Sequence, residues 1–250
     1  MRIFFYIILF LFCCSNYTLY GYKKIPAPFK VGEYIEYKIS ALGIPVALQK
    51  TKIVKITNID SIPVYHIHTE IETLPVISKI YYLHDIIDTY INTNTYLPVK
   101  ICTKIREGKW RNKVIIDIEQ DKGIALYKDK KGEKKLRFKG KLVGLISVLY
   151  FLRSILPQKG EVIKLAVSKK REVIYIKAKV KDLNKKMHIK PLSKKKPIST
   201  IHYVEKGKEQ AGIWITNDEY RVPVKIVSVI IPIGDYGVIT VVNKLKKYKP

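Results

Sequence analysis

The sequence contains few cysteines, glycines and prolines, and these scarcities exclude several kinds of protein. It has only 3 Cys, at positions 13, 14 and 102, which excludes a disulfide-dense scaffold. The 13 Gly and 12 Pro among 250 residues are too few for a collagen-like or low-complexity chain. Hydrophobic residues make up 47% of the chain, which excludes an intrinsically disordered protein, because that class lacks the apolar side chains that offset chain entropy.

Recognisable catalytic motifs are also missing. The sequence has no Gly-x-Ser-x-Gly, His-Glu-x-x-His, P-loop or Cys-x-x-Cys pattern. Cys102 has no recognisable histidine partner and lies on the polar side of its expected strand, which favours an incidental thiol. We therefore expect a protein that is not an enzyme and that needs no cofactor.

Acidic residues are scarce relative to basic ones. The chain has 21 Asp and Glu against 47 Lys and Arg, so its formal net charge is +26. In the cytoplasm such a charge would suggest nucleic acid, whereas outside it the natural counterparts are anionic phospholipids, lipopolysaccharide or acidic polymers. The alternative is a lysine-rich compositional background that leaves only a solvated surface.

The apolar run at the N-terminus is short. Ile3–Phe12 has ten residues, fewer than the roughly 20 that cross a bilayer. It follows Arg2 and precedes the small residues Cys13–Ser15, which is the pattern of a secretory signal peptide. We expect residues 1–21 to be this signal and residues 22–28 to be a linker.

Two processing routes remain open, and both lead out of the cytoplasm. Cleavage would release a soluble protein, or Leu11–Cys14 would act as a degenerate lipobox with Cys14 acylated. We expect a periplasmic or envelope-associated protein. Its expected partners are an anionic membrane surface or an envelope lipid or glycolipid, not nucleic acid, and the sequence identifies no protein partner.

Beyond residue 28 the hydrophobic pattern repeats every two residues. In Val99–Ile105 and Ile174–Val180, apolar side chains alternate with polar ones, as in strands with one buried face. Turn signals such as Glu107–Lys109 and Asp121–Gly123 separate the strands at short intervals. The pattern predicts an all-β protein, an antiparallel barrel, half-barrel or two-sheet sandwich of about a dozen strands. We expect residues 29–250 to form one domain.

Two segments interrupt the alternation. Leu142–Leu156 is almost continuously apolar, and we expect a buried helix that packs on the sheet or plugs its end. The alternative is a segment that dips into a membrane, with Arg153 inside it. Lys185–Lys196 contains six lysines, and we expect a mobile basic loop.

The segment Val64–Glu72 is the best candidate for a metal site. In a strand, His66 and His68 share one face and lie about 7 Å apart, so they can chelate Zn²⁺ or Cu²⁺ with a donor from a neighbouring strand. His84 or His202 would have to supply that donor. The alternative is a polar strand face paired with lysines across the sheet.

Short motifs along the whole chain, in a fixed order, resemble those of one known family. They are Phe29–Tyr37, Tyr96–Val99, Arg106–Gly108, Leu149–Arg153, Gly212–Asp218, Arg221–Val224 and Ile233–Gly234. The family is an exported bacterial one, domain of unknown function 3108. An acidic residue often precedes its helical Ser, whereas Lys141–Ile146 has none. The resemblance implies an exported all-β envelope protein, and it carries no known activity, so no site residues can be transferred.

The leading hypothesis is an envelope protein that binds an anionic or amphiphilic component in an apolar groove edged by lysines. Aromatic side chains would line the groove, and arginines would meet headgroups or hold the helix to the sheet. The candidate residues are Tyr37, Tyr82, Tyr150, Arg153, Trp214 and Arg221. We expect Ala at position 153 or 214 to weaken ligand retention and leave the fold intact. The alternatives are a structural or protein-interaction module, and a metal-binding or enzymatic protein centred on His66 and His68.

Overall fold

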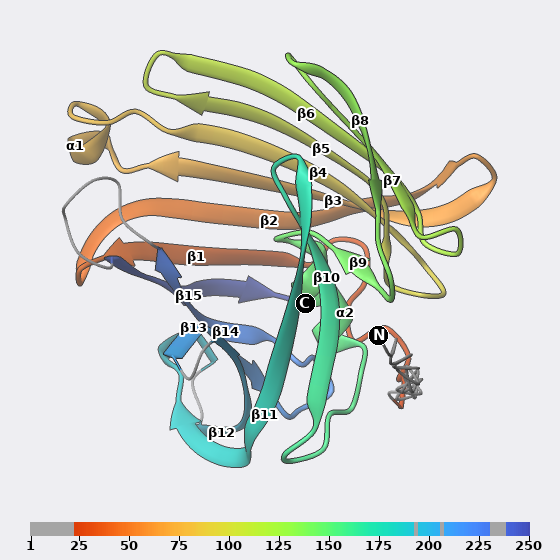
Figure 1. Cartoon of the computed structure of the whole chain (residues 1–250). Coiled ribbons are helices and arrows are strands. Elements are labelled where there is room, and N and C mark those ends of the chain that lie inside the picture. The colour runs from red at the N-terminus through yellow and green to blue at the C-terminus, as the bar shows by residue number, and fades with distance from the viewer. Residues whose placement is uncertain (1–22, 193–194, 206–207, 231–238) are drawn as a thin grey trace, which may run out of the picture.

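A computed structural model describes residues 23–192, 195–205, 208–230 and 239–250 (Figure 1). The expected signal peptide, the lipidation candidate Cys14 and the Ile233–Gly234 motif lie outside these residues. Among the helices of the described part, none is long and apolar enough to cross a membrane.

In the described part of the chain, fifteen strands form a single sheet. In the first half of the chain they are β1 (Tyr34–Ala41), β2 (Ile44–Ile59), β3 (Ile62–Thr73), β4 (His84–Asn92), β5 (Pro98–Glu107), β6 (Trp110–Glu119), β7 (Ile124–Asp129) and β8 (Gly132–Arg137). In the second half they are β9 (Leu142–Val143), β10 (Val162–Lys169), β11 (Glu172–His188), β12 (Lys195–Glu205), β13 (Lys208–Thr216), β14 (Pro223–Ile230) and β15 (Ile239–Lys249).

The sheet order is β8-β7-β6-β5-β4-β3-β2-β1-β15-β14-β13-β12-β11-β10-β9. Most neighbours follow one another along the chain, and β15 returns to pair with β1. Among the described strands, β9 alone pairs parallel, with β10. The all-β prediction is confirmed. Because every strand belongs to one sheet, the arrangement is nearest to the half-barrel among the three expected.

The sheet curls until its two ends meet. The side chain of Arg171, in the β10–β11 turn, pairs with Asp129 and donates a hydrogen bond to the carbonyl of Gly132, 3.0 Å away, at the β7–β8 hairpin. The backbone N–H of Lys139 donates to the Tyr175 hydroxyl of β11 at 3.0 Å. Figure 1 shows the β7–β8 hairpin beside β9 and β10. The two ends of the sheet, which are not joined by strand pairing, are therefore joined by contacts of the Arg171 and Tyr175 side chains.

Alternation along the strands sends one set of side chains into the curl. In β6, for example, Val114, Ile116 and Ile118 are buried while their neighbours are not, as the period of two predicts. The interior holds helix α2 (Ser147–Arg153) between the two halves of the sheet (Figure 1). Tyr150 packs in the cluster of β2–β7, and Phe151 packs in the cluster of β10–β13.

The buried helix is shorter than the sequence suggested. Leu142 and Val143 form β9, because they pair with Ala166 and Val167 of β10, and the backbone of Leu142 also exchanges hydrogen bonds with the Gln120 side chain at 2.8 and 3.1 Å. Gly144 then passes so close to the sheet that an added Cβ would lie 2.6 Å from Cδ1 of Ile101. The helix begins only after this approach, at Ser147. A second helix, α1 (Pro75–Ser78), which the sequence did not predict, lies between β3 and β4.

The prediction of a mobile basic loop at Lys185–Lys196 is wrong for most of the segment. Its first residues complete β11 to His188, Lys190–Leu192 form a 3₁₀ turn (η1), and β12 starts at Lys195. Buried Ile189 packs in the cluster with Ile35 and Val224, which anchors the connection despite its lysines. Residues 193–194 lie outside the described part.

Candidate functional site

A buried ion pair joins the helix to the first strands. Arg153, the last residue of α2, is 0% exposed, and Glu33 is 1% exposed. The two guanidinium nitrogens Nη1 and Nη2 donate to Oε1 and Oε2 of Glu33 at 2.8 and 2.6 Å. Nη2 also donates to the carbonyls of Pro28 (3.2 Å) and Tyr220 (2.9 Å). This bidentate geometry is the strongest form of the Arg–carboxylate contact.

Aromatic side chains enclose this pair. The Tyr248 hydroxyl donates to Glu33 at 3.3 Å, and the Arg153 guanidinium lies 5.4 Å from the ring centre of Tyr150. The Tyr37 hydroxyl donates to the carbonyl of Pro223 at 2.8 Å. Burial raises the pKa of Tyr37 and of Tyr150, so both hydroxyls stay neutral.

A second arginine caps the same helix. Arg221 donates from Nε to the carbonyl of Arg153 at 2.7 Å and from Nη2 to the carbonyl of Leu152 at 3.3 Å. These are carbonyls of the last turn of α2, which a cation stabilises. Burial, with the Arg153 charge beside it, lowers the pKa of Arg221 to about 10, so it remains charged at neutral pH. Two roles were expected for the arginines, either to meet headgroups or to hold the helix to the sheet. This geometry matches the second role.

Asp218 holds the turn that carries Arg221. It accepts hydrogen bonds from the Thr216 hydroxyl at 2.7 Å and from the backbone N–H of Arg221 at 3.2 Å, and it pairs with Lys196 at 2.9 Å. Burial acts to raise the pKa of Asp218, but these contacts outweigh it, and the pKa is lowered from 3.8. The carboxylate is therefore stabilised by the fold.

This contact predicts a pH dependence. Because the pKa of Asp218 is lower in the folded chain than in the unfolded chain, its carboxylate stabilises the fold at any pH above its pKa in the unfolded chain. This stabilisation is lost as the pH falls through its pKa in the folded chain. We expect Asp218→Asn to cost about 1–2 kcal/mol of unfolding free energy at pH 7. Below about pH 4 the variant should lose stability less steeply than the wild type. Urea unfolding from pH 7 to 3 measures both, and parallel profiles would contradict the assignment.

Of the six residues expected to line one groove, Tyr37, Tyr150, Arg153 and Arg221 lie together at the end of α2, and Tyr82 lies apart. Tyr37, Tyr150 and Arg153 border a cavity of about 10 Å³, which holds at most about one water molecule. Trp214 of β13 is half-buried under Lys225, whose Nζ lies 4.4 Å from the ring centre. Tyr82 lies elsewhere, just before β4, with the Arg106 guanidinium 5.0 Å from its ring centre.

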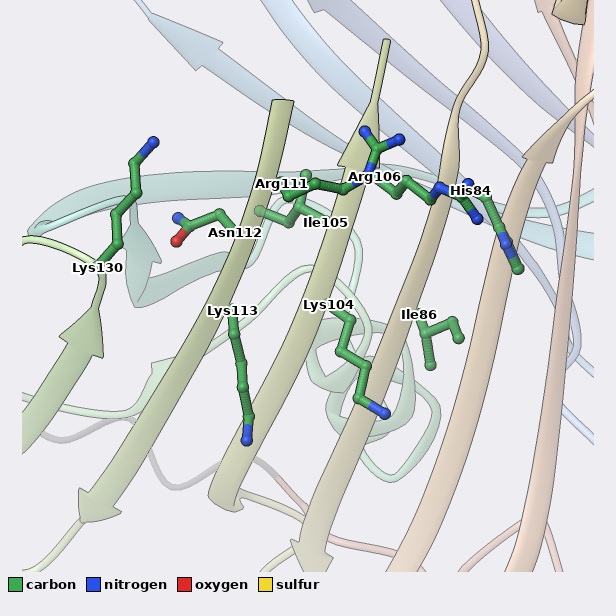
Figure 2. Close-up of a pocket in the computed structure, with 9 residues that line it drawn as sticks. All are labelled: His84, Ile86, Lys104, Ile105, Arg106, Arg111, Asn112, Lys113 and Lys130. Atoms are coloured by element: carbon green, nitrogen blue, oxygen red, sulfur yellow. The ribbon is translucent and has the colours of Figure 1, made fainter. Parts of the chain in front are cut away.

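A larger hollow is a basic depression on β4, β5 and β6, of about 660 Å³ (Figure 2). Its lining residues are His84, Ile86, Lys104, Ile105, Arg106, Arg111, Asn112, Lys113 and Lys130. The lining has five Lys and Arg and no carboxylate. We call this site the basic depression.

Strand register creates the concentration of charge in the basic depression. Lys104 lies directly opposite Lys113, and Arg106 directly opposite Arg111, so two like-charged pairs follow one another across β5 and β6. Figure 2 shows them as two successive rows across neighbouring strands. Like charges directly opposite one another destabilise a sheet. On the same two strands, by contrast, Lys100 faces Asp117 with a 2.9 Å ion pair.

A cluster of two histidines and an aspartate lies on β3 and β4. His66 Nε2 and His68 Nδ1 both contact Oδ1 of Asp88, at 2.7 and 2.8 Å. Burial opposes the charged forms, but the hydrogen bonds dominate, so the pKa of His68 is raised and that of Asp88 is lowered. Neither His84 nor His202 belongs to this cluster. The sequence analysis missed Asp88, the third member.

Cys102 lies directly opposite Asp88 on β5 as a free, half-buried cysteine. Burial raises the pKa of its thiol. A catalytic cysteine needs the thiolate form, which this environment disfavours.

Comparison with known proteins finds a matching family of unknown function and a solved structure of similar fold. A family model described as "Protein of unknown function (DUF3108)" matches residues 35–241. A crystal structure of a β-barrel-like protein of domain of unknown function DUF1849 from Brucella abortus matches with a TM-score of 0.52 and 12% identity. The match covers 87% of this chain and 97% of that one, and at this identity it shows the fold alone. No curated protein matches.

Proposed function

This chain belongs to DUF3108, a family of proteins of unknown function. We propose that it is an exported, non-enzymatic protein of the cell envelope. We propose that it binds an anionic amphiphile, a phosphate-bearing lipid or glycolipid, at the basic depression of β4–β6. The signal-like N-terminus supports export, and the absence of catalytic motifs supports a binding role.

The observation that carries the proposal is the pair of like-charged rows. Lys104 and Lys113 face one another, as do Arg106 and Arg111. Within the described residues, none of these four forms an ion pair with a carboxylate, and of them only Arg111 donates to nearby carbonyls, those of Gly108 and Trp110. A bound anion would turn the repulsion between the rows into attraction, so the rows favour a phosphate group.

The shape and remaining lining favour an amphiphile over a small ion. The depression has the size of a ligand site, and Ile86 and Ile105 add apolar surface beside the cations. Lys130 reaches in from the β7–β8 hairpin and Arg106 stacks on Tyr82 at the rim. An acyl chain next to a phosphate would meet both kinds of surface.

The test is charge reversal in the basic depression. We expect Lys104→Glu/Lys113→Glu to weaken binding to phosphatidylglycerol vesicles by at least about 10-fold, since each Lys near an anionic surface contributes about 1 kcal/mol. Co-sedimentation of the purified chain with vesicles measures the change. The matched control is Lys177→Glu/Lys179→Glu on β11, which changes the net charge equally at two exposed lysines away from the depression.

The outcomes separate local from overall charge. Retained binding in the control and lost binding in the test variant support the site. An equal loss in both variants would show that net charge, not the basic depression, drives the interaction. If the wild type does not distinguish phosphatidylglycerol from phosphatidylcholine vesicles, the proposal fails, and a protein-interaction role becomes the better hypothesis.

A further inference from the structure

We propose that His66, His68 and Asp88 form a binding site for a divalent transition-metal ion of the Zn²⁺ class. This inference is independent of the proposed function, because the three residues do not line the basic depression.

The backbone brings the three donors together. His66 and His68 are two residues apart on β3 and share a face, and Asp88 of β4 lies directly opposite His68. Nitrogens of both rings point at the same carboxylate oxygen, and the three donor atoms lie within 4.8 Å of one another. An ion between them would replace the two hydrogen bonds and move Asp88 slightly away from the rings, because atoms about 2.0–2.2 Å from a tetrahedral zinc lie about 3.3–3.6 Å from one another.

The donor set matches known zinc chemistry. Two imidazoles and one carboxylate are a ligand set that zinc uses when a further position is left open to water. The side chains of His66, His68 and Asp88 are 17%, 33% and 22% exposed, so solvent can reach that position. The cluster is therefore half-buried but accessible.

Neighbouring side chains hold the histidines in the orientation that a metal requires. His68 presents Nδ1 to Asp88, while its Nε2 lies 3.4 Å from a carboxylate oxygen of Glu70. Histidine ligands usually donate their other ring N–H to such a carboxylate, which fixes the tautomer. The ring of His66 stacks on Tyr90 with ring centres 4.7 Å apart. Both rings are thus oriented by groups other than the ligands themselves.

Charges around the cluster leave the two carboxylates to neutralise the ion. Lys52 lies opposite His68 and Lys55 opposite His66 on β2. Asp88 and Glu70 supply the negative charge beside the two imidazoles. Because these lysines would repel a cation, we expect all three ligands to be needed for binding.

Zinc titration of the purified chain tests the site. The protein carries no affinity tag and is treated with a chelator, and isothermal titration calorimetry then measures Zn²⁺ binding. We expect one equivalent of Zn²⁺ per chain, and an increase in Tm on zinc addition. His68→Ala and Asp88→Asn should each weaken the affinity by at least about 100-fold, because losing even a group that only hydrogen-bonds to a ligand costs about 10–100-fold.

Matched variants make the result specific. His188→Ala removes an exposed histidine at the end of β11 and should leave the affinity unchanged. Lys104→Glu/Lys113→Glu should also bind zinc normally, which separates this site from the lipid proposal. The inference fails if the wild type shows no saturable binding, or if His68→Ala and Asp88→Asn, shown by circular dichroism to be folded, bind zinc as the wild type does.

Discussion

Replacing Arg153 with methionine is expected to lower the free energy of unfolding by about 3–5 kcal/mol, the usual cost of breaking a buried ion pair. Methionine keeps much of the side-chain volume, so the loss comes mainly from Glu33. That carboxylate is 1% exposed, and among the side chains that the structure describes it would keep only the Tyr248 hydroxyl as a partner. Urea unfolding at neutral pH measures the change.

Two comparisons isolate the ion pair. Lys128→Met removes a half-exposed lysine that pairs with the exposed Glu133, and it should cost at most about 1 kcal/mol. The double variant Glu33→Gln/Arg153→Met should lose less than the sum of the single losses, because no unpaired charge remains. Additive losses, or a single loss below about 1 kcal/mol, would contradict a coupled buried pair.

This result changes the expectation drawn from the sequence. There, Arg153→Ala was expected to weaken ligand retention with the fold intact. The structure buries Arg153 completely and uses it to tie α2 to Glu33 and to the carbonyl of Tyr220. If an Arg153 variant bound less ligand, the first explanation would therefore be that its fold is less stable.

Truncating Phe151 to alanine is expected to cost about 3–5 kcal/mol, as for other large aromatic residues in protein cores. Phe151 is 2% exposed on the face of α2 that meets β10–β13, where it packs with Leu97, Val143 and Ile163. Helix α2 is held between two halves of the sheet, so its neighbours have little freedom to move into the space that Phe151 leaves. The loss of stability then includes both the lost burial of the ring and the cavity that remains.

The matched control for Phe151 is a neighbour on the same segment. Leu145 is 69% exposed, and Leu145→Ala should change the unfolding free energy by less than about 0.5 kcal/mol. Urea unfolding of both variants gives the comparison. Equal effects would contradict the placement of α2 inside the sheet.

Local sequence patterns predicted the strands well because side-chain alternation is a property of the extended backbone itself. Val114, Ile116 and Ile118 point inward wherever β6 lies in the sheet. The limits of the buried helix were less predictable. Leu142 and Val143 are as apolar as the helix, and only the Gln120 side chain and β10 draw them into a strand.

The candidate sites differ in how much of them the sequence contained. A two-residue turn at Gly108–Lys109 aligns β5 with β6, so the like-charged pairs of the basic depression follow from a local feature. The metal cluster does not. His66 and His68 were found by their spacing, but Asp88 is separated from them by α1 and its flanking loops, whose course decides the register.

By itself, the sequence determined the all-β class, the inward faces of the strands, the charge and the resemblance to DUF3108, because each depends on composition or on neighbours along the chain. Only the tertiary structure decided that fifteen strands form one curled sheet, and that Glu33 meets Arg153 across 120 positions of sequence. It also placed Asp88 between the two histidines. Such contacts depend on strand order and register, which are set by packing of the whole chain around α2 and not by any local pattern.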